Sequence, residues 1–438
     1  MYRSLSTAGK AMGAARNVVV VDGIRMPFAM QSSIYNDLMA VDLSRLSLKA
    51  LLTKTALDPA LIDYVTIGTV IQETKTSNIA REATMGAGIP LTVPSHTITQ
   101  ACISSNIAIC TAAEKIMAGQ ADIIIAGGVE TFSDVPIRFS RKVRQKLIGM
   151  PKAMKKGPMG AASHFFKGLK AADLAPEAPA IANFTTGEVM GVSSDRLSSK
   201  FGVSRQEMDE FTVLSHSNAG KAHAEGWYEG DVMPYKGSTE ENGIKASTME
   251  KVSKLKPAFV KPYGTHTAAN SSFLTDGASA SLIMSEEKAL ELGYKPMSYI
   301  RDWAFVACDP FEELLLGPTY GAEKCLRSMG LNMDDIGVFE VRPRRDASEA
   351  STKRRNAMDS QAFADKNFNG KKVGQIDRSK MNTKGGSLSL GHPFGATGSR
   401  LVTNASRRLQ AEEERFALLA ACADGGLGHA CILERYDN

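Results

Sequence analysis

The stretch Thr97-Ile-Thr-Gln-Ala-Cys102-Ile-Ser-Ser-Asn106 places a cysteine between a short strand-like run and a segment of small residues. The same plan returns near the end of the chain, in Phe416-Ala-Leu-Leu-Ala-Ala-Cys422-Ala-Asp-Gly-Gly. A short run of this kind bounded by small residues is typical of a strand, and the residues after Cys102 open a helical pattern. Two such units predict an internal duplication, with an active site between the two halves.

Other short apolar runs predict further strands, and helical patterns at 41–57 and 107–118 separate some of them. Strands that alternate with helices predict an α/β fold with a mostly parallel sheet. The predicted strands are 17–22, 64–70, 96–100, 123–126, 280–284, 299–306, 338–341, 416–421 and 431–434.

The chain divides into four predicted parts. Residues 1–16 contain Arg3, Lys10 and Arg16 but no acid, which is typical of a mitochondrial transit peptide, although a basic N-terminus without a targeting role has the same composition. An N-terminal domain is predicted to comprise 17–136 and 257–297. An inserted loop domain at 137–256 interrupts it, and a C-terminal domain spans 298–438.

Composition excludes several classes of protein. The 438 residues are 43% hydrophobic and 23% charged, as in a soluble globular protein. A net charge of +5 is modest for this length and does not indicate nucleic acid. No run approaches the roughly 18 apolar residues of a membrane helix. The six cysteines lack close spacing, which predicts no metal site, no disulfide framework and a reducing compartment.

One segment is strongly basic. Residues 135–172 carry ten Lys or Arg side chains and no acid, interleaved with apolar residues. Such a segment can lie on an anionic lipid surface, steer the phosphates of a charged substrate or contact a partner subunit, and a solvated face is the structural alternative. The asymmetry favours an anionic partner without choosing which. The apolar residues are Leu147, Ile148, Met150, Met154, Phe165 and Phe166.

Two thiols and a histidine are the candidate catalytic residues. A free thiol has a pKa of about 8.5, and a helix N-terminus stabilises the thiolate, so Cys102 before its predicted helix is a candidate nucleophile. His392 lies in a glycine-rich loop, Gly391-His392-Pro393-Phe-Gly395, and can accept the thiol proton. Cys422 precedes a glycine-rich turn and can protonate a carbanion leaving group, while backbone N–H groups of that turn can bind an oxyanion.

These motifs resemble those of the thiolase family over nearly the whole chain after residue 16. Supporting segments are Ala126-Gly-Gly-Val-Glu130-Thr-Phe-Ser133 and Thr267-Ala-Ala-Asn270-Ser-Ser272. The resemblance implies a duplicated, five-layered α/β/α/β/α fold and thiolytic cleavage of 3-ketoacyl-CoA, with coenzyme A as co-substrate and no other cofactor. It also implies mitochondrial β-oxidation, a homodimer, a hydratase/dehydrogenase α subunit as partner, and association with the inner membrane.

The resemblance also implies a role for each site residue. Cys102 is acylated after activation by His392, and Cys422 protonates the departing acetyl-CoA enolate and then deprotonates CoA. The N–H groups of Cys102 and Asp424, with the adjoining Gly425, hold the acyl-enzyme oxyanion, and the His392 side chain helps to hold the 3-keto oxygen. Ser272 and Asn270 lie in the segment that contacts the pantetheine arm of CoA.

The chain departs from the family pattern in one place. After 338–341 the family has a short His/Asn-Glu-Ala-Phe motif, whereas this chain reads Arg342-Pro343-Arg344-Arg345 and continues without the pattern to Arg355. Arg342 stands where the missing His or Asn is expected, a residue that positions a water in the oxyanion site. The departure is either a real loss or a local reading-frame error over 341–355. We favour the second, because both flanks keep the pattern.

Three functions compete at this point. The first is a 3-ketoacyl-CoA thiolase, and the second is a weak or inactive thiolase-like scaffold that binds the α subunit and the membrane. The state of residues 341–355 distinguishes these two. The third is a condensing enzyme of fatty-acid synthesis, which ranks last because those enzymes have a histidine where Cys422 stands. The glycine-rich stretches match no nucleotide-binding motif.

Overall fold

The computed structural model describes residues 16–180, 182–342 and 357–437, with the side chain of Arg342 excepted. Most of the predicted transit peptide and most of the departing segment therefore lie outside the described residues. Arg16, the last residue of that predicted peptide, pairs with Asp122 and lies 3.5 Å from Glu287.

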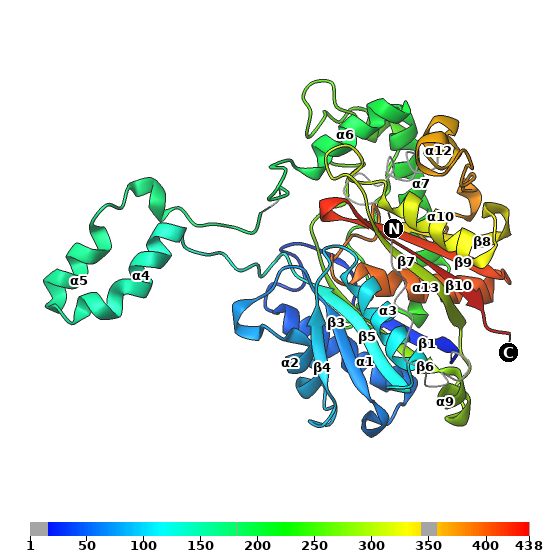
Figure 1. Cartoon of the computed structure of the whole chain (residues 1–438), viewed down its shortest axis with the longest axis horizontal. Coiled ribbons are helices and arrows are strands. Elements are labelled where there is room, and N and C mark those ends of the chain that lie inside the picture. Colours follow the sequence, from blue (N-terminus) through cyan, green and yellow to red (C-terminus); the bar gives the residue numbers. More distant parts are fainter. Residues whose placement is uncertain (1–15, 181, 343–356, 438) are drawn as a thin grey trace.

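The described strands form one ten-stranded sheet in the order β4-β3-β5-β6-β1-β7-β10-β9-β8, with β2 paired to β6 (Figure 1). The two halves meet at β1 and β7, where only Val19↔Tyr299 and Val20↔Ser298 are in register. The strands are β1 (Val18–Arg25), β2 (Ala29–Met30), β3 (Tyr64–Gly68), β4 (Ser95–Ile98), β5 (Ile123–Glu130), β6 (Thr275–Ser285), β7 (Ser298–Ala307), β8 (Ile336–Arg342), β9 (Phe416–Ala423) and β10 (Leu427–Arg435).

All nine predicted strands are present, and β2 was missed because two residues carry no periodic signal. The prediction of a mostly parallel sheet is wrong. Within the described sheet, six of the nine strand pairings are antiparallel. Antiparallel neighbours need only a short connection, such as the turn between β9 and β10. The long insertion also lets β6 return antiparallel between β5 and β1.

Three apolar cores follow from the period-two alternation of the strands. On β1, Val19 and Val21 face a core shared with α1 (Ala40–Thr55) and α2 (Ile79–Gly86), whereas Val18 and Val20 face a second core. That second core contains α3 (Ser104–Met117) and α13 (Thr397–Ala411) and also the odd-numbered residues of β9. Phe416, Leu418 and Ala420 of β9 face a third core under α10 (Gly317–Met329). The helices α3 and α13 are therefore buried between the two halves of the sheet.

The remaining helices belong to the long insertion or to short connections. In Figure 1, α4 (Arg141–Met154) and α5 (Gly157–Phe166) form a hairpin that projects away from the body. No helix of the described chain is both long and apolar enough to cross a membrane. The other helices are α6 (Met190–Phe201), α7 (Arg205–Ala224), α8 (Met249–Ser253), α9 (Glu286–Glu291) and α12 (Gln361–Asn367).

A buried charge cluster attaches the edge strand β8 to α13. Glu340 is fully buried and accepts hydrogen bonds from Arg408 Nη1 at 2.9 Å, Arg400 Nη1 at 3.3 Å and Asn404 Nδ2 at 2.8 Å. Buried charges are tolerated only when they are paired and hydrogen-bonded. The cluster therefore sets the register of β8, the strand that ends at Arg342, against the helix that follows His392.

Replacing Glu340 by Gln should lower the free energy of unfolding by about 3 kcal/mol, because buried Arg400 loses its carboxylate partner and buried Arg408 keeps only the partly exposed Glu412. Urea unfolding at neutral pH measures the change. Glu412→Gln is the control, since Glu412 pairs with Arg408 from a side chain that is 31% exposed, and its loss should stay below about 1 kcal/mol. Equal losses in the two variants would contradict the role assigned to Glu340.

Candidate active site

Cys102 lies where β4 passes into α3, as the sequence predicts. The Cys102 side chain is buried, and Ala101 before it has φ 45°, a left-handed conformation that a residue other than glycine seldom adopts. The Ser104 hydroxyl donates to the Ala101 carbonyl and accepts from the Gln100 N–H at 2.8 Å. These bonds hold the bend that presents Cys102 immediately before the first turn of α3.

His392 is buried in the loop that leads into α13. Its backbone N–H donates to Thr275 Oγ1 at 2.9 Å, and its ring lies 5.0 Å from the Phe394 ring. The ring Nδ1 is 2.6 Å from Thr397 Oγ1. Gly391 has φ 95°, and a Cβ on it would lie 2.6 Å from Thr275. The loop can therefore pass this close to Thr275 only with glycine at the position before His392.

Cys422 is buried near the end of β9, and its Cα lies opposite Gly428 of β10. The turn between these strands contains Gly425 and Gly426, with φ of 78° and 77°. Asp424 in the same turn accepts a hydrogen bond through Oδ2 from Asn183 Nδ2 at 3.3 Å. The inserted region therefore binds one carboxylate oxygen of Asp424, the residue whose backbone N–H the family resemblance assigns to the oxyanion site.

The N-terminal ends of α3 and α13 bring these segments together. The Ser399 N–H donates to Ser105 Oγ at 3.1 Å, and a Cβ on Gly398 would lie 2.3 Å from Asn106 Oδ1. Glu130 also joins two loops near this contact. It accepts a hydrogen bond from the Gly395 N–H in the His392 loop at 3.0 Å and one from the Ile71 N–H after β3 at 2.9 Å. Burial raises the pKa of Glu130 to about 8, although its backbone hydrogen bonds oppose that shift.

A cavity of about 250 Å³ opens between the three segments that carry the candidate catalytic residues. Ala101, Phe394 and Asp424 line it, and these residues lie one or two positions from Cys102, His392 and Cys422 in the sequence. Its wall is mostly apolar and comes from both the first sheet half and the inserted region. The wall includes Val70, Ile71, Phe132, Val135, Val189 and Leu274.

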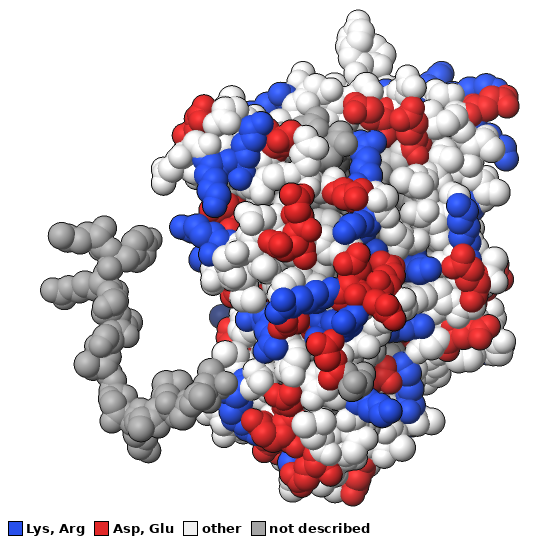
Figure 2. Space-filling model, turned by 90° about the vertical axis from the view of Figure 1, so that its right-hand side faces the viewer, with Lys and Arg blue, Asp and Glu red and all other residues white. Residues whose placement is uncertain are grey.

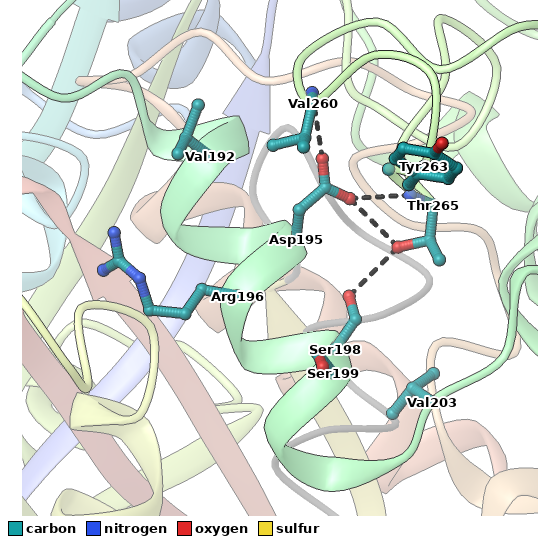
Figure 3. A pocket seen from close by; sticks show the side chains of 10 residues that line it. Val192, Asp195, Arg196, Ser198, Ser199, Val203, Val260, Tyr263 and Thr265 are labelled. Carbon is teal, nitrogen blue, oxygen red and sulfur yellow. Dashed lines mark hydrogen bonds between the residues drawn. The ribbon is translucent and has the colours of Figure 1, made fainter.

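A larger cavity of about 520 Å³ lies elsewhere, between α6 and the loop at 260–265 (Figure 3). Asp195 on α6 holds this loop by accepting from Val260 N, Thr265 N and Thr265 Oγ1. Burial opposes its ionisation, but the hydrogen bonds and charge of His266 together with the bonds from Thr265 lower the pKa of Asp195 to about 2. No residue within two positions of Cys102, His392 or Cys422 lines this larger cavity, whereas Ala101, Phe394 and Asp424 line the smaller one, so we assign the chemistry to the smaller one.

The other predicted site residues are placed as follows. Ser272 is buried, and Asn270 uses its amide within its own loop, accepting from Thr267 N at 2.7 Å and donating to Thr265 O at 3.1 Å. The Arg342 Cα lies opposite Ala421, next to Cys422, at the end of the described part of β8. Across the described residues, no cluster of three or more potential metal ligands occurs.

Sequence reasoning missed two residues that the structure places in this site, Glu130 and Thr397. Glu130 lies inside a segment that supports the family resemblance, and Thr397 lies two residues after the glycine-rich loop of His392, but the sequence does not show what either side chain contacts. A buried carboxylate that bonds two distant loops leaves no periodic signal in the chain. Its partners become apparent only when β5 and the His392 loop are adjacent.

The fold and this site define a thiolase. A family model for the thiolase N-terminal domain matches residues 18–287, and one for the thiolase C-terminal domain matches residues 294–435. The chain belongs to the thiolase family.

Individual relatives are similar over nearly the full length. The human mitochondrial trifunctional enzyme subunit beta is 52% identical over 428 residues, covering 96% of this chain and 89% of the relative. A probable 3-ketoacyl-CoA thiolase of Caenorhabditis elegans is 48% identical, covering 99% and 98%. The crystal structure of human mitochondrial 3-ketoacyl-CoA thiolase in complex with CoA is similar with a TM-score of 0.80 at 25% identity, covering 98% and 100%.

Replacing Gly398 by Ala should separate the ends of α3 and α13, because the added Cβ meets Asn106. We expect a loss of about 1–3 kcal/mol in unfolding free energy and slower alkylation of Cys102 by iodoacetamide. Gly220→Ala in α7 is the control, since its Cβ would have no neighbour within 4 Å and alanine favours a helix. A Gly398→Ala protein with unchanged stability and alkylation rate would contradict the close approach.

Proposed function

We propose that this protein is a 3-ketoacyl-CoA thiolase, an acetyl-CoA C-acyltransferase of mitochondrial fatty-acid β-oxidation. The observation that carries the proposal is the convergence of Ala101, Phe394 and Asp424 on one cavity, which brings the neighbours of Cys102, His392 and Cys422 together. Two thiols and a histidine suit carbon–carbon cleavage beside a thioester.

The first half of the reaction forms an acyl-enzyme. His392 takes the Cys102 proton, and the thiolate attacks the C3 carbonyl carbon of the 3-ketoacyl-CoA. The C2–C3 bond then breaks, its electron pair passes to the acetyl-CoA enolate, and Cys422 donates the proton that completes acetyl-CoA. The shortened acyl group remains on Cys102 as a thioester.

The second half returns the enzyme to its starting state. Cys422 accepts the proton of an incoming CoA thiol, and the CoA thiolate attacks the acyl-enzyme carbonyl. The tetrahedral oxyanion is held by the Cys102 N–H and the Asp424 N–H, in the turn that continues to Gly425. Collapse releases the shortened acyl-CoA and the Cys102 thiolate, which recovers its proton from His392. Ser272 and the loop braced by Asn270 contact the pantetheine arm.

The apolar wall of the cavity supports a fatty acyl substrate, because burial of an acyl chain is favourable by about 0.8 kcal/mol for each methylene. Val70, Ile71 and Phe132 come from the first sheet half, whereas Val189 comes from the inserted region. An acyl chain that passes between these surfaces would be covered on both sides. We therefore propose long-chain 3-ketoacyl-CoA as the substrate class.

Purified protein should cleave 3-ketohexadecanoyl-CoA in the presence of CoA, and Cys102→Ala should lower that rate by at least about 1000-fold. Acetyl-CoA formation measures both. Cys110→Ala is a matched control, because Cys110 is also a buried cysteine but lies within α3, whereas Cys102 lies before this helix. Well-folded protein without turnover would contradict the proposal and favour the alternative function, a thiolase-like scaffold. The segment 341–355, which departs from the family pattern, would then account for the missing activity.

We further propose a homodimer that assembles with a hydratase/dehydrogenase α subunit. The strand β4 ends the sheet and pairs only with β3 within the described chain, so its outer edge is available to a second copy. The relatives named as a beta subunit of a trifunctional enzyme support the α subunit as partner. Their mitochondrial location supports targeting by residues 1–16 and a position on the matrix side of the inner membrane.

The apolar cores also support a division of the chain into domains. The order of the three cores supports a duplicated, five-layered α/β/α/β/α arrangement, with α3 and α13 as the central layer. Its N-terminal domain would comprise 17–136 and 257–297, and its C-terminal domain 298–438. Residues 137–256, which include the α4–α5 hairpin, form the inserted loop domain.

The α4–α5 hairpin supports peripheral association with an anionic membrane. Ile148, Met159 and Phe166 are 80%, 85% and 71% exposed on it. Of its basic residues, Lys142 and Arg144 pair with Asp173 and Glu177, which follow α5 in the chain. On the face turned away from the hairpin, positive and negative side chains are intermixed (Figure 2). The hairpin therefore combines exposed apolar side chains with an excess of basic ones.

Vesicles rich in cardiolipin should bind the protein, and Ile148→Ser, Met159→Ser and Phe166→Ser combined should weaken binding by at least about 10-fold. Cosedimentation measures the binding, with phosphatidylcholine vesicles as the neutral reference. Leu91→Ser is the control, because Leu91 is 69% exposed but lies on the body of the molecule. Equal binding of the triple variant and the control would contradict a membrane role for the hairpin.

A further inference from the structure

A short hydrogen-bonded chain connects the ring of His392 to its own loop. The ring Nδ1 lies 2.6 Å from Thr397 Oγ1, and that hydroxyl donates to the Pro393 carbonyl oxygen at 2.9 Å. His392 is 1% exposed and Thr397 is fully buried. Bulk water therefore does not reach either side chain and does not compete for this hydrogen bond.

The direction of these bonds decides which ring nitrogen carries the proton. A threonine hydroxyl has one proton, and the Pro393 carbonyl, which also accepts from the Ala396 and Thr397 N–H groups, can only accept. The 2.9 Å contact between Thr397 Oγ1 and this carbonyl is therefore a hydrogen bond only when the hydroxyl proton points to the carbonyl. The lone pairs of Thr397 Oγ1 then face Nδ1, which must be the donor. In a neutral imidazole with its proton on Nδ1, the other nitrogen, Nε2, carries the lone pair that a base needs.

We propose that Thr397 is a positioning residue that holds His392 in the Nδ1–H tautomer, so that Nε2 is the atom that accepts the proton of Cys102. The inference rests on the proposed function only in that His392 is the base for Cys102. The step is a proton transfer from Cys102 Sγ to His392 Nε2, and it leaves a thiolate and an imidazolium whose Nδ1–H still donates to Thr397.

The surrounding contacts keep the ring from adjusting. The His392 N–H is held by Thr275 Oγ1, the neighbouring Gly395 N–H is held by Glu130, and Phe394 packs against the ring. A donor that is charged forms a stronger hydrogen bond than a neutral one. Thr397 therefore favours the imidazolium over the neutral ring, in addition to selecting the tautomer, and both effects increase the population of Cys102 thiolate.

Two substitutions separate the hydroxyl from the shape of the side chain. Thr397→Val keeps the branched shape and removes the hydroxyl, and Thr397→Ser keeps the hydroxyl. Thr403→Val is the matched control, because Thr403 is a buried threonine six residues further along α13, and its hydroxyl lies 3.3 Å from Ser281 Oγ. Glu130, Cys102 and Cys422 are present in every variant.

The first readout is the rate of Cys102 alkylation by iodoacetamide between pH 5 and 10, followed by peptide mass spectrometry. In Thr397→Val we expect the midpoint of the pH profile to move upward by about one unit and the rate at pH 7 to fall about 10-fold. Thr397→Ser and Thr403→Val should follow the unchanged protein within about threefold. Circular dichroism verifies folding, and Thr397→Ala replaces the valine variant if valine prevents folding.

The second readout is thiolysis of 3-ketohexadecanoyl-CoA. Thr397→Val should lower kcat about 10- to 100-fold with little change in KM, and Thr397→Ser should restore it. An unshifted alkylation profile in Thr397→Val, or an equal shift in Thr397→Ser or Thr403→Val, overturns the inference. Alkylation needs no turnover, so a protein that alkylates as expected but does not cleave substrate refutes the proposed function and leaves the role of Thr397 standing.

Discussion

The contact between the N-terminal ends of α3 and α13 is the constraint on which the active site depends. Gly398 leaves no room for a side chain against Asn106, and Ser399 bonds Ser105 across the same junction. Because both helices are buried between the two sheet halves, their directions are set by the second apolar core, to which strands of both halves contribute, rather than by local contacts alone. The junction brings Cys102, just before α3, and His392, just before α13, to the same place.

Several buried polar side chains around this junction form hydrogen bonds to backbone groups rather than to solvent. Glu130 joins the end of β3 to the His392 loop, and Thr275 holds the His392 backbone from β6. Glu340 performs a similar task at the far side, where it attaches β8 to α13. A buried carboxylate is costly without donors, so each of these groups is stable only when its loops are correctly placed. The reactive side chains are consequently held by a rigid framework.

The inserted region adds features that the paired sheet halves lack. It supplies part of the apolar cavity wall, it reaches Asp424 through Asn183, and it carries the projecting α4–α5 hairpin. The hairpin exposes large apolar side chains next to excess positive charge, whereas on the opposite face of the molecule the charges are mixed. The hairpin thus lies apart from the cavity to which we assign the chemistry.

The sequence by itself determined the strands, the α/β class and the three candidate catalytic residues, because apolar runs and small-residue motifs are local properties that survive in a linear reading. It did not determine the direction of the strand pairings: the mostly parallel sheet was wrong, since pairing depends on how a long insertion returns β6 to the sheet. The roles of Glu130 and Thr397 were also invisible. Their partners lie on other segments or depend on the direction of a single hydroxyl proton, and only tertiary packing brings those donors and acceptors within bonding distance.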